Sequence, residues 1–523
     1  MLTGTIPFDR YPGLPPLFLD FLRGLPEFYP DPPSSEAVAA RARQLLGARP
    51  RIAADAFRTR LPEARRMAEE LAGGRAVAVL AGHQVGLFTG PLFTITKAFD
   101  AIRVARELKD RGIPAVPVFW ALTDDHDLDE IARTARPGKN EALFFLLEGS
   151  DRSNRQPVGG LPLPENVTPV LEGFREDVRA SDGAEILEAF GRRYVPGNSY
   201  GEAFIETLFD LVEGEPLLVL DPSSEPLRRQ AAEFFAAASR NEAAVRESLR
   251  SVTESLERSG RPPTAALRPD VFPFFAVEKG ERRRVTDLGE TGRAVSAGSA
   301  WISTDVLTRP VFKSFLLPCA ASVLGASEIS YHAQSLALFS VFGLRPPVLL
   351  PRSHLVLLGP PERRAAEALG IAPGDLLYPL PPQAPPAIPE VDRLRRTTDE
   401  VHTGLSSLDE GLARLDPTLS GALETARKKV AHQLDQLMER IRKAAERKDE
   451  TTSGRRSRLE AMLLPLGSPA ERIYPPLVPL LSYGREALAT IKQAAAGSLE
   501  GAEIVNMGAD RPAEKEKESL HAG

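Results

Sequence analysis

The chain has 523 residues, of which 42% are hydrophobic and 26% charged, so it is typical of a folded protein with more than one structural unit rather than of a disordered one. The formal net charge of -6 gives no electrostatic reason to expect nucleic acid or an anionic membrane as a partner. No apolar run of about 18 residues could span a membrane, and the N-terminus lacks the features of a signal peptide. The single cysteine, Cys319, excludes an internal disulfide and fits a reducing cytoplasm.

The N-terminal part of the chain predicts surface segments and helices ahead of the first strand. Residues 1–35 are rich in proline and aromatic side chains, and we expect them to wrap over a surface. Amphipathic helices are predicted over 36–46 and 54–72. A short apolar strand over 76–80 follows, and the glycine-rich segment 82–91 is predicted to be a loop whose backbone comes close to another group.

The stretch 75–131 has the pattern of a strand, a helix and a second strand. The helix is predicted over 92–110 and ends at a glycine. The second strand, 115–121, is apolar throughout, which suits a strand buried on both faces of a parallel sheet. Each strand is followed by a polar cluster, at 82–84 and at 124–127. Because ligands bind outside the carboxyl ends of such strands, we expect the functional site there.

The middle of the chain repeats this succession of strand, polar cluster and helix. Residues 136–200 are predicted to be a connecting insertion, and a helix over 200–211 follows. A third buried strand, 216–220, ends at Asp221, which is predicted to cap the next helix. The stretch 304–342 is predicted to be helical and apolar.

A strand-rich insertion is predicted near 260–300, and a fourth apolar strand, 347–350, ends just before Arg352. This recurrence predicts an α/β fold with a doubly wound parallel core and connecting insertions. The core is expected in two parts, 1–135 and 201–378.

The composition and the hydrophobic pattern of the sequence change after residue 378. Residues 379–465 are predicted to be a proline-rich linker followed by a helical coiled coil, because apolar residues step by three, four or seven. Asp416-Pro417 interrupts this pattern. A proline inside a helix costs ~3 kcal/mol or more, so we favour two antiparallel helices that turn there over a kinked single rod. The segment 466–508 is expected to pack back on the core, and 509–523 to form a disordered tail.

The cluster Asp124-Asp125-His126-Asp127 carries the clearest chemistry. A carboxylate beside an imidazole can orient the ring and raise its basicity, which suits a general base. A metal site is an alternative, but no second histidine or carboxylate at helical spacing accompanies the cluster, and we predict no metal. A solvated acidic turn that caps a helix is the third interpretation.

Two further groups of residues could contact a ligand. The segment 82–91 matches neither the dinucleotide fingerprint nor the phosphate loop, but its glycines and the following helix N-terminus could receive an anion. Lys97 could reach that anion or be solvated. Glu328, Tyr331 and His332 would share one face of a helix. Capping by Glu328 and core packing of His332 are the alternatives.

Four motifs along the chain carry a resemblance to a known family. They read Gly82-His83-Gln84…Gly86-Leu87-Phe88-Thr89-Gly90-Pro91…Lys97, then Val116-Pro117-Val118-Phe119-Trp120 with Asp124-Asp125-His126-Asp127, then Arg309-Pro310…Leu317-Pro318…Gly325…Glu328-Ile329…Tyr331 with Pro351-Arg352, and finally Leu464-Pro465…Glu471-Arg472 with Tyr483-Gly484. On these motifs the chain resembles the cysteine-adding enzymes of bacillithiol biosynthesis, the BshC family.

The resemblance implies a Rossmann-like core related to class I aminoacyl-tRNA synthetases and nucleotidyltransferases, with a coiled coil that pairs two subunits as a homodimer. It also implies a reaction that joins the carboxyl group of cysteine to the amine of glucosaminyl-malate. A free carboxylate needs activation before it can form an amide. The synthetase-like core that the resemblance implies suggests activation with a nucleotide, such as ATP or ADP, and the sequence does not show which one.

The resemblance and the strand-end clusters together define a set of expected site residues. The catalytic set is Asp125, His126, Asp124 and His83. The substrate-binding set is Gly82, Gln84, Thr89, Gly90, Lys97, Trp120, Asp127, Glu328, Tyr331, His332 and Arg352, where Arg352 is expected to neutralise a carboxylate. The nucleotide-binding set is Glu471, Arg472 and Tyr474.

The chain departs from the family pattern at several of these positions. The departures are His83 in place of a glutamine, Asp124 in place of a glutamate, Ala326-Ser327 in place of a Gly-Pro-like step, His332 in place of a tryptophan, and Pro469-Ala470 and Pro475 in the last motif. They leave a related amine, thiol or sugar acid open as the substrate. A nucleotidyltransferase acting on another small acid and a non-catalytic coiled-coil scaffold are the alternative functions.

Overall fold

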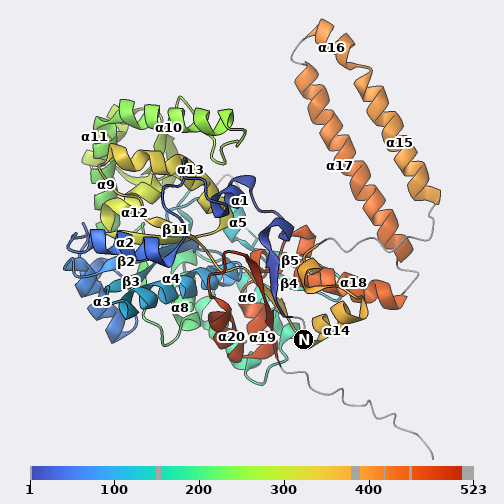
Figure 1. The fold of residues 1–523 in the computed structure, drawn as a ribbon, viewed down its shortest axis with the longest axis horizontal. Helices are drawn as coiled ribbons and strands as arrows, with labels where there is room; N and C mark the ends of the chain where they lie inside the picture. Colours follow the sequence, from blue (N-terminus) through green and yellow to red (C-terminus); the bar gives the residue numbers. More distant parts are fainter. Residues whose placement is uncertain (1–2, 149–154, 379–388, 417–418, 447–449, 509–523) are drawn as a thin grey trace, which may run out of the picture.

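A computed structural model describes residues 3–148, 155–378, 389–416, 419–446 and 450–508 (Figure 1). Its centre is a five-stranded sheet in the order β11-β10-β2-β3-β6, in which every neighbouring pair is parallel. The strands are β2 (Val77–Gln84), β3 (Ala115–Leu122), β6 (Leu218–Leu220), β10 (Cys319–Leu324) and β11 (Val348–Pro351). In chain order the third, second and first strands lie on one side, and the fourth and fifth on the other. This is the doubly wound Rossmann arrangement that the sequence predicts, and its switch point falls between β2 and β10.

Both faces of this sheet are covered by helices, because alternate strand residues point to opposite faces. Val77 and Val79 of β2 belong to one hydrophobic cluster, and Ala78 and Leu80 to another. The first face is covered mainly by α2 (Ser35–Leu45), α4 (Phe93–Asp110), α8 (Tyr200–Leu211) and α19 (Leu477–Tyr483). The second is covered mainly by α3 (Pro62–Ala72), α9 (Glu225–Arg240), α10 (Glu242–Arg258) and α12 (Arg309–Leu316).

A second sheet joins the two ends of the chain. Its order is β1-β13-β12, in which β13 (Gly501–Asn506) pairs antiparallel with β1 (Thr5–Pro7) and parallel with β12 (Leu355–Leu358). A third hydrophobic cluster packs α1 (Pro16–Leu22) and part of α13 (Ala326–Val341) beside this sheet. The segment after the coiled coil therefore packs back on the core.

Two insertions add small antiparallel sheets. The first contains the hairpin of β4 (Arg133–Pro137) and β5 (Ala142–Leu146), followed by α6 (Val167–Glu172) and α7 (Gly183–Arg193). The second contains the sheet β8-β7-β9, formed by β7 (Phe272–Glu278), β8 (Glu281–Val285) and β9 (Ala300–Thr304), together with α11 (Leu288–Ser296). The core also contains α5 (Leu128–Ile131), α14 (Pro360–Ala368) and α20 (Glu486–Ala494).

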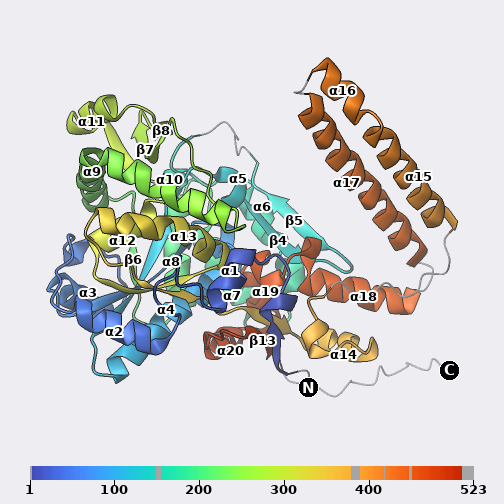
Figure 2. The same cartoon turned by 45° about the horizontal axis from the view of Figure 1, so that its top comes forward.

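A helical hairpin projects away from the core (Figures 1 and 2). Its first arm is α15 (Pro389–Ser406) with α16 (Asp409–Leu415), and its second arm is α17 (Leu419–Glu446). The guanidinium of Arg427 donates to the carbonyl of Leu405 at 3.1 Å and ties the arms together. The chain thus reverses as the antiparallel prediction requires, although Pro417 lies outside the described residues. The next helix, α18 (Glu450–Leu463), leaves the hairpin and packs against α14.

The predictions for the central strands were wrong at two places. Residues Gly82 to Gln84 are not a loop but the end of β2, because pairing with β3 continues to Gln84 and Leu122. The stretch 304–342, predicted to be helical, contains the central strand β10. A strand buried on both faces lacks the alternating pattern that separates strands from buried helices.

Three helix predictions also need correction. The helix expected over 54–72 is interrupted where Arg58 forms an antiparallel bridge with Val219. The amphipathic stretch 480–495, whose pattern predicts one helix, is divided at Gly484, whose φ of 74° separates α19 from α20. Asp221 does not immediately precede α9; it accepts a hydrogen bond from the backbone N–H of Ser223 at 2.8 Å. In the described part of the chain, no helix is long and apolar enough to cross a membrane.

Candidate active site

A cleft of about 550 Å³ opens at the switch point of the central sheet. The ends of β2 and β3, the start of α13 and the sheet of the second insertion surround it. Its polar and aromatic lining includes His83, Gln84, Phe93, Lys97, Asp125, His126, Glu130, Arg268, Phe275, Arg282, Arg284, Asp305, Arg309, Glu328, Tyr331, Arg352, His354 and Arg472. The cleft thus brings together predicted residues from all four motifs.

The glycine-rich segment shapes the backbone beside the cleft. A Cβ at Gly82 would lie 2.6 Å from the carbonyl oxygen of Trp120, so a side chain there would push the two central strands apart. A Cβ at Gly86 would lie 2.8 Å from the Cα of Gly90. The backbone N–H of Thr89 donates to the Tyr194 hydroxyl at 2.8 Å, away from the cleft. The close backbone approach that was predicted is therefore to other parts of this chain.

An ion pair of Lys97 and Glu328 forms the floor of the cleft. The Lys97 ammonium also donates to the carbonyl of Gly82 at 3.1 Å, and Glu328 accepts from the backbone N–H of Gly325 at 2.6 Å. Burial would raise the pKa of Glu328, but Lys97 and the Gly325 N–H lower it to about 2. The pair fixes the end of β2 to the start of α13, and Glu328 also caps that helix.

His83 stands beside this ion pair. Its ring packs edge-on against Phe93, with ring centroids 4.8 Å apart. Burial, together with the charges of Lys97 and Arg352, lowers the pKa of His83 to about 3 in spite of the opposing charge of Glu328. His83 is therefore a neutral group at physiological pH.

The pair Asp125 and His126 lies at the end of β3 and faces the cleft. The backbone N–H of His126 donates to Asp125 at 2.8 Å, and the Gln84 amide approaches the same carboxylate at 3.4 Å. Burial would raise the pKa of Asp125, but hydrogen bonding by His126 and the charges of Arg282 and Arg309 lower it well below its usual range. Asp125 is thus a carboxylate anion at neutral pH.

The other acidic residues of this cluster point elsewhere. Asp124 is buried and accepts a hydrogen bond from the Ser303 hydroxyl at 2.7 Å. Asp127 caps α5 by accepting from the backbone N–H of Glu130 at 3.2 Å. Trp120 is fully buried in the core beneath the sheet. Of this motif, only Asp125 and His126 line the cleft, whereas Asp124 forms a buried hydrogen bond and Asp127 caps a helix.

Arg352 lines the cleft but is paired with Glu471. Its two terminal nitrogens donate to the Glu471 carboxylate at 3.0 and 2.8 Å, which is a bidentate ion pair. Tyr11, the His354 ring and the backbone N–H of Leu355 also contact this carboxylate, at 2.5, 3.1 and 2.8 Å. Burial alone would raise the pKa of Glu471, but Arg352 and His354 lower it far below its usual range. This network connects the last motif to the end of β11.

The remaining predicted residues divide between the cleft and the interior. Tyr331 and Arg472 line the cleft. His332 is buried, and its Nδ1 contacts the carbonyl of Glu328 at 2.7 Å. Tyr474 is buried as well, and its hydroxyl donates to the carbonyl of Ala461. His332 and Tyr474 are therefore held by backbone carbonyls rather than presented to the cleft.

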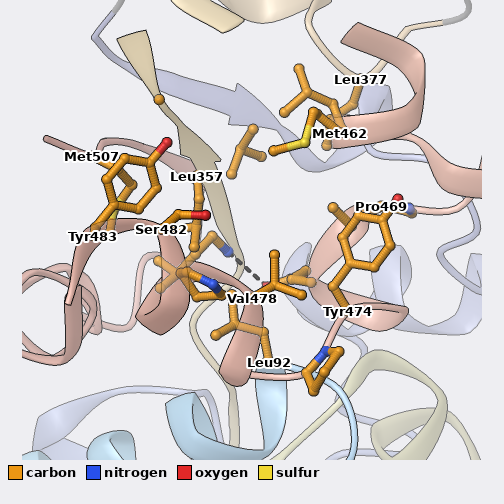
Figure 3. Close-up of a pocket in the computed structure, with 18 residues that line it drawn as sticks. Leu92, Leu357, Leu377, Met462, Pro469, Tyr474, Val478, Ser482, Tyr483 and Met507 are labelled. Carbon is orange, nitrogen blue, oxygen red and sulfur yellow. Dashed lines mark hydrogen bonds between the residues drawn. The ribbon is translucent and has the colours of Figure 1, made fainter. Parts of the chain in front are cut away.

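A second, smaller cavity lies under the C-terminal segment (Figure 3). Tyr474, Val478, Leu357 and Met507 stand around it, and its volume is about 60 Å³. Glu471 is the one charged residue among the described side chains that line it, and that carboxylate is already paired with Arg352. A volume of this size holds only a few water molecules.

Sequence reasoning missed several residues that face the cleft, above all Arg282 and Arg309. Arg282 comes from β8, where the run Arg282-Arg283-Arg284 suggests only a solvated strand. Its guanidinium contacts Asp125 at 3.2 Å and is buried against Phe275. Arg309 belonged to a quoted motif, but nothing in its spacing assigns it to the site. Both were missed because the insertion reaches the cleft only through tertiary folding.

The described residues contain no group of three or more His, Cys, Asp or Glu side chains arranged to hold a metal ion. The fold and the cleft define a class of protein: a Rossmann-type protein with a small-molecule site at its switch point and a helical hairpin attached.

Two family models match this chain. Residues 38–353 match the N-terminal Rossmann-like domain of the bacillithiol biosynthesis protein BshC, and residues 388–506 match its C-terminal coiled-coil domain. The relatives include proteins named "Putative cysteine ligase BshC". The relative from Solibacter usitatus is 28% identical over 83% of this chain and 85% of its own. The relative from Koribacter versatilis is 28% identical over 95% of this chain and 98% of its own. The chain belongs to the BshC family of bacillithiol biosynthesis.

Proposed function

We propose that this protein is a ligase that joins the carboxyl group of cysteine to the amine of glucosaminyl-malate and so forms the amide bond of bacillithiol. The observation that carries the proposal is the Asp125–His126 pair, which faces a cleft large enough for two small substrates. Membership of the family and the names of its relatives support the same reaction.

The cleft offers opposite charges to the two kinds of substrate group. The Asp125 carboxylate is ionised and partly exposed, so it can hold the amine of either substrate as an ammonium ion. Arg309 and Arg472 have no ion-pair partner among the described residues, and both line the cleft. They can meet the carboxylates of the substrates, whereas both terminal nitrogens of Arg352 are engaged by Glu471.

A nucleotide fits the cleft better than the small C-terminal cavity. Phosphate groups need cations or backbone N–H groups, and the cleft supplies Arg309 and Arg472, whereas Lys97 is engaged by Glu328. The C-terminal cavity has no lysine or arginine among its described lining residues. Bound ATP would supply the leaving group that a free carboxylate lacks. Of the predicted nucleotide contacts, Arg472 is the one that the cleft can use.

The test is product formation from cysteine and glucosaminyl-malate, with and without ATP, followed by mass spectrometry of the thiol product. We expect Asp125→Asn and His126→Gln to lower the rate by roughly 10²–10⁴-fold, the range for groups that act on the transferred proton or charge. Asp127→Asn is the matched control, because asparagine caps a helix as well as aspartate does. Full activity in both cleft variants would overturn the site, and a product without cysteine would favour the nucleotidyltransferase alternative.

We further propose that the helical hairpin pairs two subunits. Leu408, Leu415, Leu419 and Leu437 of the hairpin are each at least 37% exposed, which leaves apolar surface for a partner helix. Sedimentation of a Leu415→Glu variant tests this, and we expect a smaller species than the unsubstituted chain forms. The cytoplasmic location predicted from the sequence stays a prediction.

A further inference from the structure

We propose that Arg282 is a positioning residue that fixes the proton of His126 on Nε2, so that His126 offers a hydrogen-bond donor to the cleft. The inference rests on the proposed function for its chemical meaning. Its geometry stands independently of that function, because it concerns contacts within the chain.

Arg282 is held rigidly from several directions. Its Nε donates to the Ser303 hydroxyl at 3.0 Å, and its Nη2 donates to the carbonyl of Thr304 at 3.2 Å. The guanidinium carbon lies 3.6 Å from the centre of the Phe275 ring. The Ser303 hydroxyl in turn donates to the buried carboxylate of Asp124. This explains why Asp124 faces the interior while Asp125 faces the cleft.

The third nitrogen of the guanidinium, Nη1, determines which ring nitrogen of His126 carries the proton. Arg282 Nη1 lies 2.6 Å from His126 Nδ1 and 3.2 Å from the Asp125 carboxylate. A guanidinium has only donors and stays charged in proteins. If Nδ1 also carried a proton, two N–H groups would face each other at 2.6 Å. Nδ1 must therefore accept from Arg282, and the proton of the neutral ring lies on Nε2.

The competing contact of Nδ1 is weaker. His126 Nδ1 lies 3.4 Å from the Asp125 carboxylate, which would be a long hydrogen bond even if Nδ1 carried the proton. Asp125 accepts instead from the backbone N–H of His126 at 2.8 Å and from Arg282. With the proton on Nε2, the N–H groups of Arg282 and the backbone N–H of His126 all have acceptors, and the Nε2 proton is left facing the cleft.

This arrangement changes what His126 can do. A ring whose Nδ1 lone pair is occupied cannot take a proton there, so His126 is not the general base that the sequence suggests. Its Nε2 instead donates. The Nη1 of Arg155 lies 3.4 Å from Nε2, at the long end of the hydrogen-bond range, so it opposes a proton there far less than Arg282, at 2.6 Å, opposes a proton on Nδ1. Two neighbouring donors of this kind suit an oxygen that gains negative charge, such as the carbonyl oxygen of the cysteine acyl group during amine attack.

The direct test is long-range proton–nitrogen NMR of protein labelled with ¹⁵N-histidine. The chain has seven histidines, and loss of one set of signals in His126→Gln assigns the ring of interest. We expect Nδ1 of His126 to be unprotonated and Nε2 to be protonated. A protonated Nδ1 in the unsubstituted protein would overturn the proposal. The result does not depend on any substrate, so it is separate from the test of the ligase reaction.

Variants of Arg282 provide the second test. In Arg282→Met we expect the proton to move to Nδ1, which can then donate to Asp125, and kcat to fall by roughly 10²–10³-fold, the loss typical of one donor to a developing oxyanion. Arg283→Met is the matched control, since that neighbouring side chain is 73% exposed and pairs only with Glu281 among the described residues. An unchanged His126 spectrum in a folded Arg282→Met protein would contradict the proposal. Arg282→Lys is the conservative variant for the case that Arg282→Met does not fold: its ammonium group also has only donors, so the proton must stay on Nε2, and a proton on Nδ1 would contradict the proposal.

Discussion

Charged residues dominate two regions of this molecule, the walls of the cleft and the helical hairpin, but water reaches them very differently. Around the cleft, the side chains of Arg352 and Glu471 are 3% and 1% exposed. On the hairpin, those of Arg414 and Glu410 are 79% and 94% exposed. A charge that has left water must be paired, whereas an exposed charge gains little from its partner. The same residue types therefore organise a site in one region and stay solvated in the other.

The largest effect should follow from breaking the most buried pair. Glu471→Gln leaves the Arg352 guanidinium buried without a counter-charge, and we expect a loss of ~3–5 kcal/mol in the free energy of unfolding. Denaturant unfolding followed by the fluorescence of Trp120 and Trp301 measures it, since Trp120 is fully buried and Trp301 is partly buried beneath the guanidinium of Arg228. Glu410→Gln on the hairpin is the control. A loss below about 1 kcal/mol for Glu471→Gln would remove the contrast between the regions, because exposed ion pairs also contribute up to about 1 kcal/mol to the free energy of unfolding.

The second effect is a loss of stability in acid that originates around the cleft. The pKa of Glu328 falls from its usual 4.5 to about 2 in the folded chain. A carboxyl group with a lowered pKa stabilises the fold above its unfolded value, and this stabilisation is lost as the pH falls from about 4.5 to about 2. Its size is on the order of 3 kcal/mol. Across this pH window, the free energy of unfolding should change less with pH in Glu328→Gln than in the unsubstituted protein. Equal slopes would contradict the assignment.

A third, smaller effect concerns the partner of Glu328. Lys97→Met removes a charge-assisted hydrogen bond from the floor of the cleft, and we expect a loss of ~1.5–3 kcal/mol. Lys109→Met, on the same helix, removes an exposed ammonium 3.9 Å from Glu63 and serves as the matched control. Thermal unfolding of both variants measures the difference. If they lose the same stability, burial is not what separates them.

The smallest effect is expected on the hairpin itself. Arg427 forms an ion pair with Asp409 across the two arms. Because the Asp409 side chain is 46% exposed, Asp409→Asn should cost only ~0.2–1 kcal/mol. The helical signal in circular dichroism during heating reports this loss. A shift as large as that of Glu471→Gln would mean that the hairpin depends on charge as strongly as the cleft does.

Much of this architecture could be predicted from the sequence, because local patterns encode it. The strand, helix and strand of 75–131, the third strand and the hairpin are all periodic or bounded by turn residues. The strand β10 could not be distinguished from a helix, because its six residues are all buried. Arg282 could not be assigned to the site, because its contacts with Asp125 and His126 span more than 150 positions in the chain. Spacing along the sequence does not encode such contacts.

The pairing of β1 with β13 has a consequence for the order of folding. Thr5 lies opposite Glu503, so β1 has no neighbouring strand until the residues of β13, almost 500 positions later, have been made. The hydroxyl of Tyr11 likewise cannot form its hydrogen bond to Glu471 until that residue, 460 positions later, has been made. During synthesis the Rossmann core can begin to form as soon as its five strands have emerged, but the wall of the cleft that holds Arg352 must remain open until the hairpin is complete. A ribosome-bound chain stalled before residue 471 should therefore have a central sheet but an unfinished cleft.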